Sequence, residues 1–164
     1  IGLTGNRPQS APACSFLRYA SCYGDIANSY FMQEIKDIIE LQTNSQTERL
    51  TFATRYLVQI NFTFDLTVIS GKFSGTSHFC VRRDEIEKFC EDLTKMHLSL
   101  TGSSRLSDND SDGFIKFSVN EYGHLQVGGQ VGGSHEDHFL KFRFQTDQTC
   151  IPKFIDDFEK LIKK

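Results

Sequence analysis

The sequence has no tryptophan, only three prolines and two methionines, and its five cysteines form no Cys-x-x-Cys pair. An odd number of widely spaced cysteines argues against a disulfide framework, so we expect reduced thiols in the cytoplasm. No apolar run approaches the ~20 residues that a membrane helix needs, and we therefore expect no membrane partner. What the chain has in excess is phenylalanine, with 15 copies among 164 residues, which predicts a core built on aromatic packing.

The charges are almost balanced, with 18 Lys and Arg against 21 Asp and Glu and a net charge of −3. Such a total gives no basic footprint for nucleic acid or for anionic lipid, although a local patch can hide inside a balanced sum. We therefore expect no nucleic-acid partner. The length fits one domain that buries a real core.

Residues 1–31 differ from the rest of the chain. They contain Pro8 and Pro12 and show neither a strand alternation nor a helical stripe. They also lack the basic start and apolar segment of a signal peptide. We expect residues 1–31 to be poorly ordered or foreign to the natural protein, which would then start at Met32. Residues 32–164 are expected to form a single α+β domain.

Strand signals dominate the first half of this domain. From Val58 to Val68 apolar and polar residues alternate, which predicts a long antiparallel strand with one wet face. Residues 73–81 return as its hairpin partner, and the apolar run at 35–41 also favours a strand.

Two segments have the apolar spacing of amphipathic helices. The first starts at Asp84, which with Glu87 fits a capping box, and ends before Gly102. The second carries Pro152 in its first turn. Between them a polar loop, residues 103–112, leads to three short strands at 114–119, 124–131 and 138–144. The order strands, helix, strands, helix predicts an α+β fold, with one antiparallel sheet of five to six strands and both helices on one face.

The loop Asp108-Asn109-Asp110-Ser111-Asp112-Gly113 copies the first half of a calcium-binding EF-hand. Alternate carboxylates of a turning loop can converge on a hard cation. The match fails at the twelfth position, where Val119 replaces the bidentate Glu, and the flanks have strand patterns. An acidic, solvated loop is favoured, and a calcium site remains the alternative.

His135-Glu136-Asp137-His138 is a second polar cluster. Two histidines three residues apart can share a zinc ion on a helix, but this stretch follows two glycines and predicts a loop. No third ligand and no paired acid and base can be located along the chain. We therefore expect no metal, no cofactor and no catalytic residue, and an enzyme is the least supported function.

The segment from Phe62 to Leu161 resembles the WapI-like immunity proteins of bacterial polymorphic toxin systems. The resemblance rests on Phe73-Ser74-Gly75, on Gly123-His124-Leu125-Gln126-Val127-Gly128-Gly129, and on Leu140-Lys141-Phe142-Arg143-Phe144 followed by Asp147-Gln148-Thr149. It implies a cytoplasmic, non-enzymatic protein that protects its producer by binding a cognate secreted toxin.

The charge pattern indicates where such a partner would bind. An acidic surface gains association rate against a basic cleft such as that of a nuclease. The residues expected to form it are Asp108, Asp110, Asp112, Glu136 and Asp137. The alternative function is a small-ligand or divalent-metal-binding domain that uses the three aspartates. The sequence makes no prediction of the oligomeric state.

Overall fold

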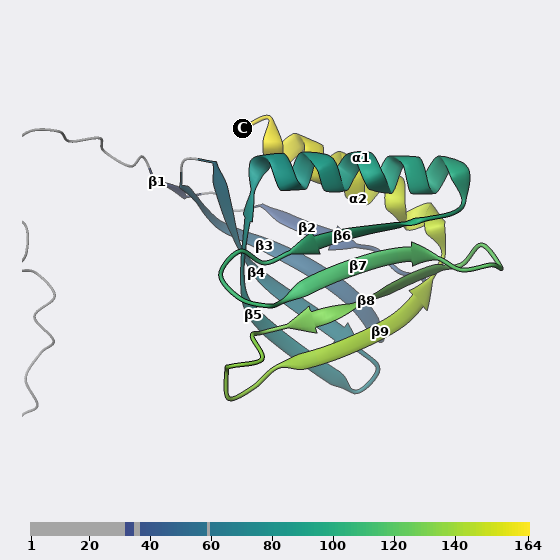
Figure 1. Ribbon diagram of the computed structural model, residues 1–164, viewed down its shortest axis with the longest axis horizontal. Helices are drawn as coiled ribbons and strands as arrows, with labels where there is room; N and C mark the ends of the chain where they lie inside the picture. Colours follow the sequence, from purple (N-terminus) through teal and green to yellow (C-terminus); the bar gives the residue numbers. More distant parts are fainter. Residues whose placement is uncertain (1–31, 35–36, 59) are drawn as a thin grey trace, which may run out of the picture.

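The computed structural model describes residues 32–34, 37–58 and 60–164, which contain nine strands and two α-helices (Figure 1). In chain order the elements are β1 (Met32–Glu34), β2 (Ile38–Leu41), β3 (Glu48–Val58), β4 (Asn61–Ser70), β5 (Phe73–Arg82), α1 (Arg83–Ser99), β6 (Ser103–Ser107), β7 (Phe114–Val119), β8 (Leu125–Val131), β9 (Leu140–Thr146), the 3₁₀-helix η1 (Gln148–Cys150) and α2 (Ile151–Ile162). The predictions for residues 1–31 lie outside the described residues.

The strands form two antiparallel sheets. In the first, β1 and β2 both pair with β3, which is followed by β4 and β5; the second is the meander β6-β7-β8-β9. The α+β class is confirmed, whereas the predicted single sheet of five to six strands is wrong. Alternating polarity shows that a strand has one dry face, but it does not say which strands share a sheet.

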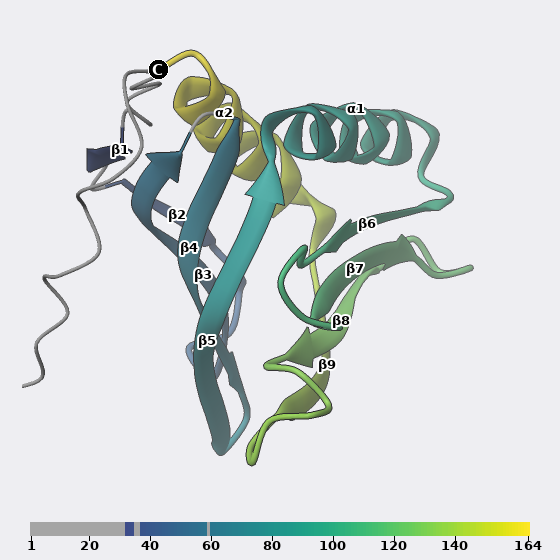
Figure 2. The same ribbon diagram turned by 60° about the vertical axis from the view of Figure 1, so that its left-hand side comes forward.

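The two sheets stand on opposite sides of the molecule, and the helices lie across one end of the space between them (Figure 2). Helix α1 contacts β5 of the first sheet and β6 and β7 of the second, while α2 contacts α1 and β2. The helices therefore join two sheets instead of covering one face of a single sheet. Away from the helices, the side chain of Leu140 in β9 packs over Gly75 in β5, where an added Cβ would lie 3.2 Å from Leu140 Cδ2.

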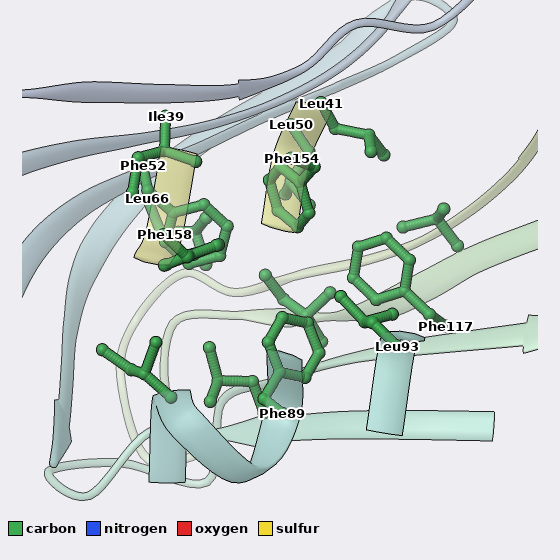
Figure 3. Close-up of a cluster of buried hydrophobic side chains, with 14 of the residues drawn as sticks. Ile39, Leu41, Leu50, Phe52, Leu66, Phe89, Leu93, Phe117, Phe154 and Phe158 are labelled. Carbon is green, nitrogen blue, oxygen red and sulfur yellow. The ribbon is translucent and has the colours of Figure 1, made fainter. Parts of the chain in front are cut away.

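Phenylalanine rings from both sheets and both helices fill the core (Figure 3). The ring of Phe158 lies 5.2 Å from Phe52, 6.1 Å from Phe89 and 5.0 Å from Phe154, centroid to centroid, in edge-on contacts. Such geometry is favoured by the quadrupoles of the rings. On the side of the second sheet, Phe117 lies 5.6 Å from Phe89. The predicted phenylalanine core is present.

The long strand predicted from Val58 to Val68 is present as β4, but it begins at Asn61, because Val58 ends β3 and pairs across a tight turn with Asn61. Strand β3 was not predicted, because its pairing with β4 shifts register between Thr54 and Tyr56. A bulge of this kind breaks the period-two alternation that predicts a strand.

Both predicted helices are present, with small changes at their ends. The N-cap of α1 is Arg82, two residues earlier than the predicted Asp84, and the amide of Arg82 donates to Glu85 Oε2 at 3.1 Å. Helix α1 stops at Leu100, whose φ of 55° is left-handed, and α2 has Pro152 in its first turn. Among the described residues, no helix is long and apolar enough to cross a membrane.

Candidate partner-binding surface

The loop between β6 and β7 is held in place by Asp108. This carboxylate accepts hydrogen bonds from the amides of Cys80 (2.8 Å) and Asp110 (3.2 Å) and from the hydroxyl of Ser111. The amide of Asn109 in turn donates to the carbonyl of Cys80 at 2.8 Å. Only 8% of Asp108 is exposed. Its side chain therefore fastens the loop to β5 and is not presented to a partner.

Asp112 links this loop to the one between β8 and β9. Its carboxylate accepts hydrogen bonds from the amide and hydroxyl of Ser134 and from Gln130 Nε2, the last at 3.2 Å. The Ser134 hydroxyl, followed by the Ser134 amide, holds the pKa of Asp112 below its usual range, because these donors stabilise the carboxylate. Gln130 is buried and also donates to the carbonyl of Gly132. The two acidic loops thus form one connected unit.

The remaining three predicted partner-binding residues, Asp110, Glu136 and Asp137, are exposed. None of them takes part in an ion pair between described residues. Their negative charges are therefore available to solvent or to a partner. We call the unit formed by these three residues and the two loops that carry them the acidic end of the second sheet.

The residues weighed as metal ligands do not converge. In the part of the chain that the structure describes, no group of three or more His, Cys, Asp or Glu side chains could hold a metal ion. Asp108 and Asp112 use their carboxylate oxygens for the hydrogen bonds described above. His135 and His138 are both exposed in the loop between β8 and β9.

The cysteines of the described chain are free thiols with little nucleophilic character. Burial raises the pKa of Cys90 to about 12 and that of Cys150 to about 11. Burial, followed by the charge of Asp110, also raises the pKa of Cys80. Since the thiolate is the reactive form, these three side chains are poor nucleophiles at neutral pH.

A second charged surface, which the sequence analysis missed, lies on the outer face of the β6–β9 sheet. Arg105, Lys116, Lys141 and Arg143 are all exposed there, and an open groove of about 530 Å³ runs between three of them. The signal was present in the sequence: in β7 and β9 these cations alternate with buried apolar residues. The overall net charge concealed it.

The described residues thus form an α+β fold with two exposed charged surfaces on the second sheet, an acidic one at its end and a basic one on its outer face. Residues 37–164 match the family model of the WapI-like immunity proteins, and the chain belongs to this family. The resemblance noted in the sequence is confirmed.

Other comparisons are more distant. No curated protein matches the chain in sequence. Among solved structures, a chain in the crystal structures of Trypanosoma brucei MRP1/MRP2 is similar with a TM-score of 0.47 and 7% sequence identity, over 77% of this chain and 83% of that chain.

Proposed function

We propose that this chain is a cytoplasmic immunity protein that binds a cognate secreted toxin directly and blocks it, without catalysing a reaction. Membership of the WapI-like immunity family supports the proposal. The structural observation that carries it is the junction at Asp112, which joins two acidic loops into one surface at the end of the second sheet.

The hydrogen bonds within this surface favour tight binding. Asp108 fixes one loop to β5, and Asp112 fixes the second loop to the first. A surface that is ordered before it meets its partner loses less conformational entropy on binding. The exposed carboxylates of Asp110, Glu136 and Asp137 are then held in these two loops at the end of the second sheet.

A nuclease is the kind of toxin that fits this surface best. Nucleic-acid clefts are lined with Lys and Arg because they must neutralise phosphates. Carboxylates presented from fixed loops take the place of those phosphates, and their charge raises the rate of encounter. In this arrangement the immunity protein inhibits by covering the cleft.

The experiment that tests the proposal uses the toxin encoded next to the gene for this chain. Wild-type protein is expected to rescue cells that produce this toxin and to inhibit the purified toxin. The double variant Glu136→Lys/Asp137→Lys is expected to weaken binding by at least about tenfold, mainly through a slower association rate.

A matched control places the same charge change elsewhere. Glu91→Lys/Glu121→Lys alters two exposed acids, one on α1 and one in the turn between β7 and β8. This control should bind like the wild type. Absence of any binding between wild-type protein and toxin would refute the proposal. An equal loss of affinity in both double variants would show that only net charge matters.

A further inference from the structure

The outer face of the β6–β9 sheet is basic, although the whole chain has a net charge of −3. The four strands contain no Asp or Glu and carry four cations, Arg105, Lys116, Lys141 and Arg143. An even mixture of both signs would be expected on a face that serves only for solubility. Because these strands carry only positive charges, their outer face differs from an ordinary solvated surface.

Strand register places three of these cations in one row across the sheet. Arg105 pairs with Lys116, Lys116 pairs with Gly128, and Gly128 pairs with Arg143. Adjacent strands lie about 4.8 Å apart, so the backbones of Lys116 and Arg143 flank the glycine at a separation of about 10 Å. Because Gly128 has no side chain, it forms the floor of the 530 Å³ groove, and Lys141 lines the same groove.

The charges of this face are not neutralised within the described chain. No ion pair between described residues includes any of the four cations. Arg105 is oriented by other contacts: its guanidinium carbon lies 3.8 Å from the ring centroid of Phe114, and its Nε donates to Ser107 Oγ at 3.1 Å. Lys116 and Arg143 remain free to bind an external anion.

We infer that this basic groove binds an acidic loop or extended segment of the toxin. The inference rests on the proposed function and deepens it, because it adds a second contact of opposite sign to the acidic end of the same sheet. A carboxylate lying above Gly128 is within reach of Lys116 and of Arg143, and the guanidinium can hold it with two parallel hydrogen bonds.

Two surfaces of opposite sign on one sheet also fix the orientation of the partner. A toxin rotated by half a turn would bring like charges together at both places, which is costly. Nucleic acid fits the groove less well. Platforms for single strands stack successive bases on several exposed aromatic rings. Of the two phenylalanines that line this groove, Phe114 is covered by Arg105 and Phe142 is only 8% exposed.

The test compares two charge-reversal variants of equal net charge by calorimetry with the toxin encoded beside this gene. Lys116→Glu/Arg143→Glu is expected to weaken binding by at least about tenfold and to reduce its dependence on salt. The control Lys72→Glu/Lys88→Glu changes two exposed lysines in the β4–β5 turn and on α1. It should bind within about threefold of the wild type. Circular dichroism and thermal melting check that each variant folds, and Lys116→Gln/Arg143→Gln replaces the first variant if it does not.

Each outcome separates the inference from the proposed function. Equal affinity of both double variants for the toxin would overturn the inference and leave the proposed function standing. A wild-type protein that does not bind the toxin at all would overturn both. Binding of a single-stranded oligonucleotide that is lost in Lys116→Glu/Arg143→Glu, with toxin binding unchanged, would assign the groove to nucleic acid instead. A toxin variant with an acid replaced by Lys that restores binding to Lys116→Glu/Arg143→Glu would establish the direct contact.

Discussion

The carboxylate of Asp108, in the loop between β6 and β7, accepts a hydrogen bond from the amide of Cys80 in β5 of the first sheet, with 2.8 Å between Oδ1 and N. Both residues are buried. Replacing Asp108 with Ala leaves a buried amide without an acceptor, so we expect the free energy of unfolding to fall by roughly 1–3 kcal/mol. Asp108→Asn keeps one carbonyl oxygen and should lose less. Urea denaturation followed by circular dichroism measures both, and equal stability of wild type and Asp108→Ala would contradict this role.

Adjacent glycines in β8 should respond very differently to the same substitution. A Cβ added to Gly129 would lie 2.1 Å from the carbonyl oxygen of Phe114, whereas one added to Gly128 would lie 3.1 Å from that of Phe142. Both contacts are with backbone oxygens, which no side-chain rotation can move, but only the contact at Gly129 is far shorter than van der Waals distance. We expect Gly129→Ala to lower the free energy of unfolding by about 2–3 kcal/mol or to prevent folding, and Gly128→Ala to cost clearly less. Thermal melting of both variants measures the two losses of stability. A larger loss in Gly128→Ala than in Gly129→Ala would refute the strand pairing.

Phe158 should be among the most costly phenylalanines to truncate. Its ring contacts Phe52 of β3, Phe89 of α1 and Phe154 of α2 and is 0% exposed. Phe158→Ala is expected to destabilise the protein by about 3–5 kcal/mol, through lost burial and a residual cavity. Phe73, which is 71% exposed, provides the matched control. Phe73→Ala should change the stability by only a few tenths of a kcal/mol, and similar losses in both variants would contradict the core as described.

The link between the two acidic loops should weaken in acid. The pKa of Asp112 is lowered in the folded state, first by the Ser134 hydroxyl and then by the Ser134 amide. Its contribution to stability is therefore complete above the unfolded pKa of about 3.9 and is lost as the pH falls through the lower folded value. In an NMR titration we expect the Ser134 amide resonance to report a pKa below about 3.9. Asp112→Ala should abolish this step, and a midpoint at or above the ordinary value would argue against the hydrogen bonds.

The elements that depend on local pattern could be predicted from the sequence. The stripe of Ile151, Phe154, Ile155, Phe158 and Leu161 predicts α2, and every one of these residues is buried. The strand β6 could not be predicted in the same way, because Ser103–Ser107 contains only one apolar residue, Leu106. The division into two sheets depends on which strands pair, and period-two alternation carries no information on partners.

The candidate surface was predictable in part. Residue type and loop position identified Asp108 and Asp110 equally, yet the first is buried against Cys80 and the second is exposed. The difference arises because Cys80 lies 28 residues away, in β5 of the first sheet, and no local pattern can show that contact. Lys116 and Arg143 were missed for a related reason. They become neighbours only through the strand register on either side of Gly128.

The place of α2 in the chain has a consequence for how the protein is made. Helix α2 follows all nine described strands in sequence, yet Phe154 and Phe158 pack at the centre of the core, against β3 and α1. While the chain emerges from the ribosome, both sheets can form with their phenylalanine faces still open to water, because the helix that closes them comes after them. Until residues 151–162 emerge, the nascent chain resembles the incompletely packed intermediates that chaperones and proteases recognise. The core is therefore complete only when α2 docks.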